Sequence, residues 1–128
     1  MTTSTAVVLV AHGSPDPDWR VPVDALAARL RERFDGPVVV AYLGFLGPDL
    51  EAAVEELYAA GHRDLRVLSV FLSPGGKHIK RDVPDAVAGL AARHPDLRLR
   101  LQPGALGAEP EVIEALAVAA ARALGEDE

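Results

Sequence analysis

The chain has 128 residues, 49% of them hydrophobic, which is typical of one folded domain and argues against an intrinsically disordered chain. Its formal net charge of −6 argues against general nucleic-acid binding, and no apolar run approaches the roughly 20 residues that a membrane-spanning helix needs. The absence of cysteine excludes a disulfide framework, a thiolate zinc site and a cysteine-held iron–sulfur cluster, and we expect a cytoplasmic protein.

The first half of the chain alternates apolar runs with segments of helical period. Residues 6–11 are apolar on both faces, as a central parallel strand requires. Apolar residues then recur at helical spacing over residues 23–34, before a second apolar run at residues 38–43. Pro48 is expected to open the next helix, and Gly61 is expected to end it.

The second half repeats the same alternation. Residues 65–72 form the third apolar run, and Asp82 is a good N-cap for a helix that Pro95 ends. Leucine and arginine alternate over residues 97–101, which is typical of a half-exposed edge strand, and Pro110 begins the last helix. We therefore predict a single α/β domain over residues 1–128, a doubly wound parallel sheet of four strands with helices on both faces.

Two histidines follow strands that should be neighbours in this sheet. Right-handed crossovers favour the strand order 2-1-3-4, which places the first and third strands together where the order reverses. Ligands bind at the carboxyl ends of the strands at such a point. His12 directly follows the first strand, and His78 lies six residues past the third. We therefore expect both imidazoles at the same rim, with Asp16, Asp18 and Trp19 bordering its mouth.

The residue types at this rim suit a metal ion and an anionic ligand. Neutral imidazole is a common metal ligand and also a base near physiological pH. Lys77, Lys80 and Arg81 form a cationic cluster just before a helix N-terminus, which suits carboxylates or phosphates. The other two histidines, His62 and His94, lie at predicted helix ends and fit C-terminal capping.

Three segments carry a family likeness. The sequences VVLVAHGS at residues 7–14, FLSPGGKHIKRDVP at 71–84 and QPGALG at 102–107 resemble the small CbiX/SirB-type sirohydrochlorin chelatases. This resemblance implies a chelatase-like fold and a lyase that inserts cobalt or iron, and in some relatives nickel, into sirohydrochlorin during cobalamin or sirohaem synthesis. The divalent ion is then a substrate, no organic cofactor is needed, and a single short module acts as a homodimer without nucleic-acid or membrane partners.

The resemblance also assigns roles to individual residues. His12 and His78 match the family's catalytic and metal-binding histidines. Neutral histidines can hold a divalent ion weakly enough to release it and can accept the two pyrrole protons. Contacts to the carboxylate-rich macrocycle are implied for Gly13, Ser14, Gly75, Gly76, Lys77, Lys80 and Arg81.

One position departs from the family pattern. Many members carry a glutamate just after the second strand, where this chain has Gly44. Without that carboxylate the chain lacks a third ligand or proton acceptor, which leaves open an alternative function as a non-catalytic tetrapyrrole or metal carrier. Histidine phosphatases also begin with a strand that ends in His-Gly. Those enzymes need an arginine immediately before the histidine, whereas this chain has Ala11, so a histidine phosphatase is disfavoured.

Overall fold

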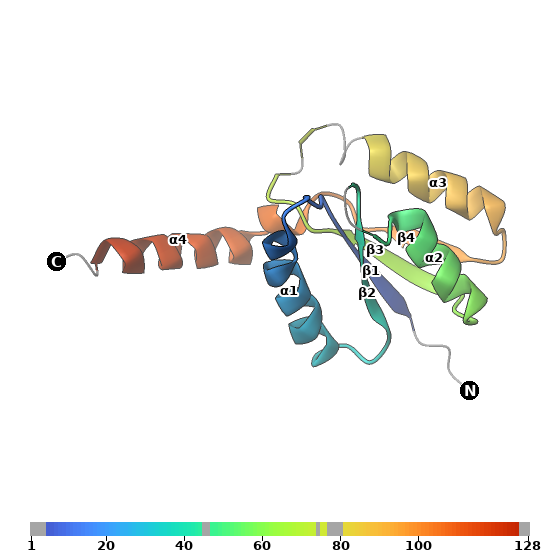
Figure 1. The fold of residues 1–128 in the computed structure, drawn as a ribbon, viewed down its shortest axis with the longest axis horizontal. Helices are drawn as coiled ribbons and strands as arrows, with labels where there is room; N and C mark the ends of the chain where they lie inside the picture. Colours follow the sequence, from blue (N-terminus) through green and yellow to red (C-terminus); the bar gives the residue numbers. More distant parts are fainter. Residues whose placement is uncertain (1–4, 45–46, 74, 77–80, 126–128) are drawn as a thin grey trace.

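A computed structural model of the chain describes residues 5–44, 47–73, 75–76 and 81–125. Within these residues four parallel strands form one sheet (Figure 1). The strands are β1 (Ala6–Ala11), β2 (Val38–Tyr42), β3 (Asp64–Ser69) and β4 (Arg98–Leu101). Their order is β2-β1-β3-β4, so the predicted 2-1-3-4 topology is confirmed.

The central strand β1 is the most apolar element of the sheet, and all six of its residues are buried. Val8 pairs with Val39 on one side and with Val67 on the other. The third strand is shorter than the apolar run 65–72 predicts. The N–H group of Val70 still donates to the Val10 carbonyl (2.7 Å), but the Phe71 carbonyl then accepts a hydrogen bond from Gly107, outside the sheet. This change of partner ends β3 at Ser69.

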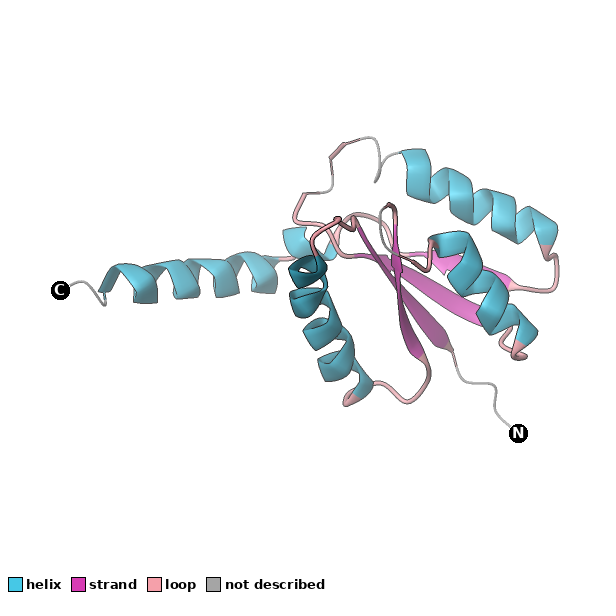
Figure 2. Cartoon of the chain, viewed as in Figure 1, coloured by secondary structure: helices cyan, strands magenta, loops and turns pink. Residues whose placement is uncertain are grey.

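Helices cover the two faces of the sheet unequally (Figure 2). One face carries α1 (Val21–Arg31), which follows the short 3-10 helix η1 (Pro17–Arg20). The opposite face carries α2 (Leu50–Ala59) and α3 (Val83–Arg93). The side chain of Asp49 accepts a hydrogen bond from Ala52, so Asp49 caps α2 and Pro48 lies just before the helix.

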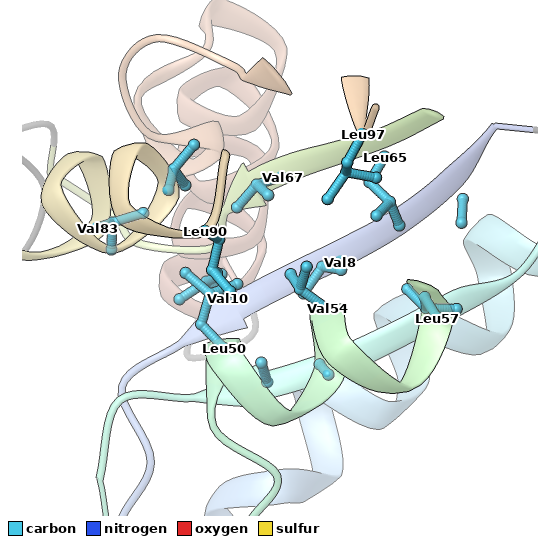
Figure 3. Close-up of a cluster of buried hydrophobic side chains, with 14 residues drawn as sticks. Val8, Val10, Leu50, Val54, Leu57, Leu65, Val67, Val83, Leu90 and Leu97 are labelled. Carbon is cyan, nitrogen blue, oxygen red and sulfur yellow. The ribbon is translucent and has the colours of Figure 1, made fainter. Parts of the chain in front are cut away.

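The larger part of the core lies between the sheet and the two helices α2 and α3. Val8, Val10 and Val67 of the sheet meet Val54 of α2 and Leu90 of α3, and each of these is at most 1% exposed (Figure 3). Burying one such side chain contributes about 1.5–3 kcal/mol. A smaller cluster on the other face joins the sheet to α1. Helices therefore pack against both faces of the sheet, and this packing gives the loops at the carboxyl ends of the strands a rigid support.

The last helix, α4 (Pro110–Gly125), does not lie on the sheet. It follows a short 3-10 helix, η3 (Leu106–Ala108), and begins at Pro110 as predicted. It then extends away from the body of the protein as an arm (Figure 1), and none of its residues is buried. In the described part of the chain, no helix is long and apolar enough to cross a membrane.

Candidate functional site

The loop after β1 presents His12 at the carboxyl-terminal edge of the sheet. Ala11 is buried as the last residue of the strand, whereas His12 is exposed. The backbone at this point is bound to the segment after β2, because the N–H of Gly44 donates to the His12 carbonyl (3.1 Å). The imidazole therefore stands on a backbone that two adjacent strands hold in place.

Gly13 and Gly44 pack against each other beside His12. Gly13 has a φ of +88°, a conformation that side chains disfavour. A Cβ atom at position 13 would also collide with the Gly44 carbonyl oxygen. A Cβ atom at position 44 would meet nothing within 4 Å. Glycine is thus required at position 13, while position 44 has room for a side chain next to His12.

Ser14 and Asp16 organise the turn that leads to α1. The Ser14 hydroxyl accepts a hydrogen bond from the N–H of Asp16 (3.1 Å). The Asp16 carboxylate in turn accepts from the N–H of Asp18 (3.0 Å), and so caps η1. These bonds give both side chains a structural role, and contact of Ser14 with a ligand stays a prediction.

The loop after β3 meets His12, as the topology predicts. The ring of Phe71 contacts the imidazole edge-on, with centroids 4.8 Å apart and planes at 85°. The backbone of Phe71 is held in place by the loop after β4, because the Phe71 carbonyl accepts a hydrogen bond from the N–H of Gly107 (2.8 Å). A Cβ atom at position 107 would collide with the Phe71 carbonyl oxygen and the Leu72 backbone. The segments after all four strands therefore position His12: Gly44 after β2 binds its backbone, Phe71 after β3 contacts its ring, and Gly107 after β4 holds Phe71.

Phe71 is a site residue that the sequence pattern does not predict. It lies in the apolar run 65–72, where an aromatic side chain indicates a buried strand as readily as a contact to a neighbouring loop. Only the early end of β3 at Ser69 turns it toward His12.

The remaining predicted site residues fall partly within the described structure. Gly75 and Gly76 are exposed, and Gly76 has a φ of +97°. The N–H of Gly75 donates to the Ser73 hydroxyl (3.1 Å). Arg81 is exposed just before α3. His78, Lys77 and Lys80 lie outside the described residues, so the pairing of His12 with His78 stays a prediction. The described residues contain no group of three or more His, Asp or Glu side chains placed to hold a metal ion.

A cavity of about 490 Å³ opens beside this edge of the sheet. Asp16, Asp18 and Trp19, predicted to border the site mouth, line it together with Val70 and residues of α1. Trp19 is 42% exposed, so its indole face is available to a ligand. The volume lies within the range of about 300–1,000 Å³ that is usual for small-molecule sites.

The other two histidines have structural roles at helix ends, as predicted. The N–H of His62 donates to the Leu57 carbonyl at the end of α2 (3.0 Å). His94 is the C-cap residue of α3, and its Nε2 atom lies 2.9 Å from a Glu55 carboxylate oxygen. Both histidines thus stabilise the ends of helices α2 and α3, away from the carboxyl-terminal edge of the sheet, and neither is a candidate residue for the site there.

Comparison with known proteins identifies relatives of one kind. A family model described as CbiX matches residues 6–123. Sirohydrochlorin cobaltochelatase of Methanothermobacter thermautotrophicus is 36% identical over 78 residues, which are 61% of this chain and 54% of that protein. Sirohydrochlorin cobaltochelatase of Methanopyrus kandleri is 38% identical over 80 residues, 62% of this chain and 55% of that protein. The matched segment thus spans little more than half the length of these relatives.

Solved structures share the fold. The putative cobalamin biosynthesis CbiX protein of Marinobacter aquaeolei VT8 superposes with a TM-score of 0.82 at 27% identity, covering 95% of this chain and 98% of that one. The sirohydrochlorin chelatase SirB of Bacillus subtilis subspecies spizizenii, solved in complex with cobalt, superposes with a TM-score of 0.69 at 24% identity. That match covers 78% of this chain and 43% of SirB, and at this identity it shows the fold alone.

Proposed function

Because the chain belongs to the CbiX family, we propose that it inserts a divalent metal ion into a sirohydrochlorin-type tetrapyrrole. The observation that carries the proposal is the placement of His12 at the strand-order reversal, held against Phe71. The two curated relatives described above are named for cobalt insertion, and this supports cobalt as the first ion to test. Iron and nickel are the other candidate ions.

The reaction exchanges one divalent ion for two pyrrole N–H protons. His12, exposed at the rim, serves as a ligand that carries the ion to the macrocycle and as an acceptor for a released proton. His78 is proposed as the second ligand and proton acceptor. Oxidation states do not change in this exchange, so the reaction needs no organic cofactor.

The macrocycle is proposed to contact His12 and to extend over the cavity that Asp16, Asp18 and Trp19 line. Trp19 offers an aromatic face, and Val70 extends the apolar floor. Arg81, exposed just before α3, is proposed to bind a peripheral carboxylate together with Lys77 and Lys80. Gly13, Ser14, Gly75 and Gly76 are proposed to contribute backbone contacts at the same edge.

We further propose that residues 1–128 act as one domain, in the cytoplasm, and as a homodimer. The match to SirB covers 43% of that chain, which leaves room in SirB for a second module of similar size. In the proposed homodimer, each copy of this chain supplies one of the two modules.

A spectrophotometric assay tests the proposed activity. Sirohydrochlorin is incubated with the protein and with Co²⁺, Fe²⁺ or Ni²⁺ in turn, and the macrocycle absorbance is followed against the uncatalysed rate. The variant His12→Ala is expected to insert metal about 100-fold or more slowly, since it loses a ligand and a proton acceptor. His62→Ala, a matched change at a helix end, is expected to keep the wild-type rate. Equal rates for His12→Ala and the wild-type protein would contradict the proposal.

The glycine at position 44 favours a second candidate function, a tetrapyrrole or metal carrier without turnover. Such a carrier would bind sirohydrochlorin, seen as a shifted absorbance band, yet would leave the insertion rate at its uncatalysed value with every ion. Binding together with accelerated insertion excludes this alternative.

A further inference from the structure

The hydroxyl of Tyr42 is a buried polar group without a hydrogen-bond partner in the described part of the chain. Tyr42 is the last residue of β2 and is 1% exposed, and its ring packs in a cluster with Val23 and Val70. Its hydroxyl oxygen is buried and meets no donor or acceptor among the described residues. Burying a hydroxyl without a hydrogen bond is unfavourable, so Tyr42 favours a ligand that supplies an acceptor.

The guanidinium group of Arg20 lies above the same ring. Its central carbon is 5.4 Å from the centroid of the Tyr42 ring. Apart from this ring contact, its Nε atom is buried without an acceptor, and no carboxylate of the described residues forms an ion pair with it. A guanidinium keeps its charge at physiological pH and presents its donors in one plane. A cation and a hydroxyl therefore lie side by side, and the described chain gives neither of them an acceptor.

This pair lies at the same edge of the sheet as His12. Two residues after Tyr42, the N–H of Gly44 donates to the His12 carbonyl (3.1 Å), so the end of β2 holds the backbone that carries the imidazole. Val23 and Val70, which pack with the tyrosine ring, also line the cavity of about 490 Å³. The pair therefore borders both the backbone of His12 and the wall of this cavity.

Arg20 and Arg81 approach this edge from opposite faces of the sheet. Arg20 is the N-cap residue of α1, and Arg81 directly precedes the N-cap residue of α3. The helices α1 and α3 pack on opposite faces, and His12 follows the central strand between them. Cations on both sides of a planar ligand that is rich in carboxylates fix its rotation as well as its position, whereas cations on one side leave it free to turn.

We propose that Arg20 and Tyr42 together bind one peripheral carboxylate of the macrocycle and so set its orientation relative to His12. This proposal rests on the proposed function and adds to it a pair of residues that orient the substrate. The planar guanidinium can donate to both oxygens of a carboxylate, and the Tyr42 hydroxyl can donate a further hydrogen bond to the same group. Such a carboxylate supplies the acceptors that the described chain lacks, and the burial of Tyr42 strengthens the bonds.

Fluorescence of the single tryptophan measures the binding. Trp19 lines the cavity and is the only tryptophan of the chain, so metal-free sirohydrochlorin is expected to quench its emission. Arg20→Gln is expected to raise the Kd about tenfold and Tyr42→Phe about threefold, because each variant removes donors to one carboxylate. Arg29→Gln makes the same change of charge at an exposed position of α1, and it is expected to keep the wild-type Kd.

The variants also separate ligand binding from a structural role. If Arg20 only covers the Tyr42 ring, Arg20→Gln lowers the melting temperature and leaves the Kd unchanged. Tyr42→Phe keeps the ring and removes only the hydroxyl, so it keeps the test decisive if Arg20→Gln misfolds. Because both groups bind the same carboxylate, the double variant is expected to lose less affinity than the two single losses added together. An equal Kd for the wild-type protein and both single variants overturns the proposal, even if the pair binds free phosphate.

The insertion assay distinguishes this proposal from the proposed function. Arg20→Gln is expected to raise the KM for sirohydrochlorin about tenfold and to leave kcat within about twofold, since Arg20 contacts the periphery and not the reacting nitrogens. His12→Ala is expected to keep the Kd and to lose kcat. A wild-type protein that binds the macrocycle but inserts no metal refutes metal insertion alone. Metal insertion with an unchanged KM in Arg20→Gln refutes the carboxylate contact alone.

Discussion

At position 44 the chain has room for the carboxylate that its family pattern includes. The N–H of Gly44 binds the His12 carbonyl, and a Cβ atom there would meet no other atom within 4 Å. Its neighbour Gly13 has no such freedom, since its φ is positive and a Cβ atom there would collide with Gly44. A side chain at 44 therefore starts from a residue that is bonded to the His12 backbone, and it does not disturb the loop.

We predict that Gly44→Glu folds normally and accelerates cobalt insertion about tenfold, because a carboxylate beside His12 adds a ligand or proton acceptor. Initial rates with sirohydrochlorin and Co²⁺ measure the effect, and thermal unfolding checks the fold. Gly44→Gln has nearly the same shape without the charge and serves as the control. If both variants match the wild-type rate, a carboxylate at this position is irrelevant to the reaction.

Individual site residues were predictable to different degrees. His12 follows a run that is apolar on both faces, and such a run fixes both the central strand and its end. Phe71 could not be assigned, because its role depends on where β3 stops and on a hydrogen bond from Gly107, 36 positions away. Sequence patterns carry little information about such long-range partners.

At the scale of elements, a polar network joins the ends of α2 and α3. The rings of Tyr58 and His94 stack with centroids 4.0 Å apart, and the Tyr58 hydroxyl donates to Asp96 (2.7 Å). Hydrogen bonds from His94 and Arg93 lower the pKa of Glu55 below its ordinary value of 4.5. The hydrogen bond from Tyr58 lowers the pKa of Asp96 below its ordinary value of 3.8. Both carboxylates thus favour the folded state when ionised.

This network makes the stability of the protein sensitive to acid. A carboxylate with a lowered pKa contributes stability that is present above its ordinary value, about 4.5 for Glu55, and is lost as the pH falls through the lowered pKa. We predict that Glu55→Gln lowers the melting temperature near neutral pH and reduces its dependence on pH below about 4.5. Thermal unfolding across a pH series measures this. Glu56→Gln, at its exposed neighbour, is expected to keep the wild-type profile, and identical profiles for both variants would refute the role of Glu55.

Most elements could be predicted, and the exceptions have physical causes. The strand at residues 6–11 follows from its uninterrupted apolar run, and the edge strand near 98–101 follows from its alternation of leucine and arginine. The strand in the apolar run 65–72 ends at Ser69, because the Phe71 carbonyl accepts its hydrogen bond from Gly107 in a loop instead of from a strand. The helix at 110–125 is as predicted, but its periodicity does not state which surface its apolar face contacts.

At the scale of the whole molecule, the core and the arm contribute to stability in different ways. Leu9 is fully buried in the core, whereas no residue of α4 is buried. We predict that the melting temperature of the wild-type protein rises with protein concentration, because the proposed homodimer pairs folded chains only. Differential scanning calorimetry at several concentrations measures the dependence.

Two variants separate the contributions of core and arm. Leu9→Ala is expected to lower the free energy of unfolding by about 2–5 kcal/mol and to keep the concentration dependence. Leu116→Glu places a charge on the exposed apolar side of α4, and this variant is expected to lose the dependence of the melting temperature on protein concentration. A melting temperature that is independent of concentration in the wild-type protein would contradict the proposed homodimer.

The position of β1 at the centre of the sheet also dictates when the protein can fold during synthesis. β1 is made before the other strands but pairs with β2 and β3, so its second partner emerges from the ribosome only with residues 64–69. Until then the most apolar strand stays without its full set of neighbours, and pairings between residues so distant in sequence form slowly. The nascent chain therefore passes through an aggregation-prone stage, and rapid translation of the segment that separates β1 from β3 would shorten it.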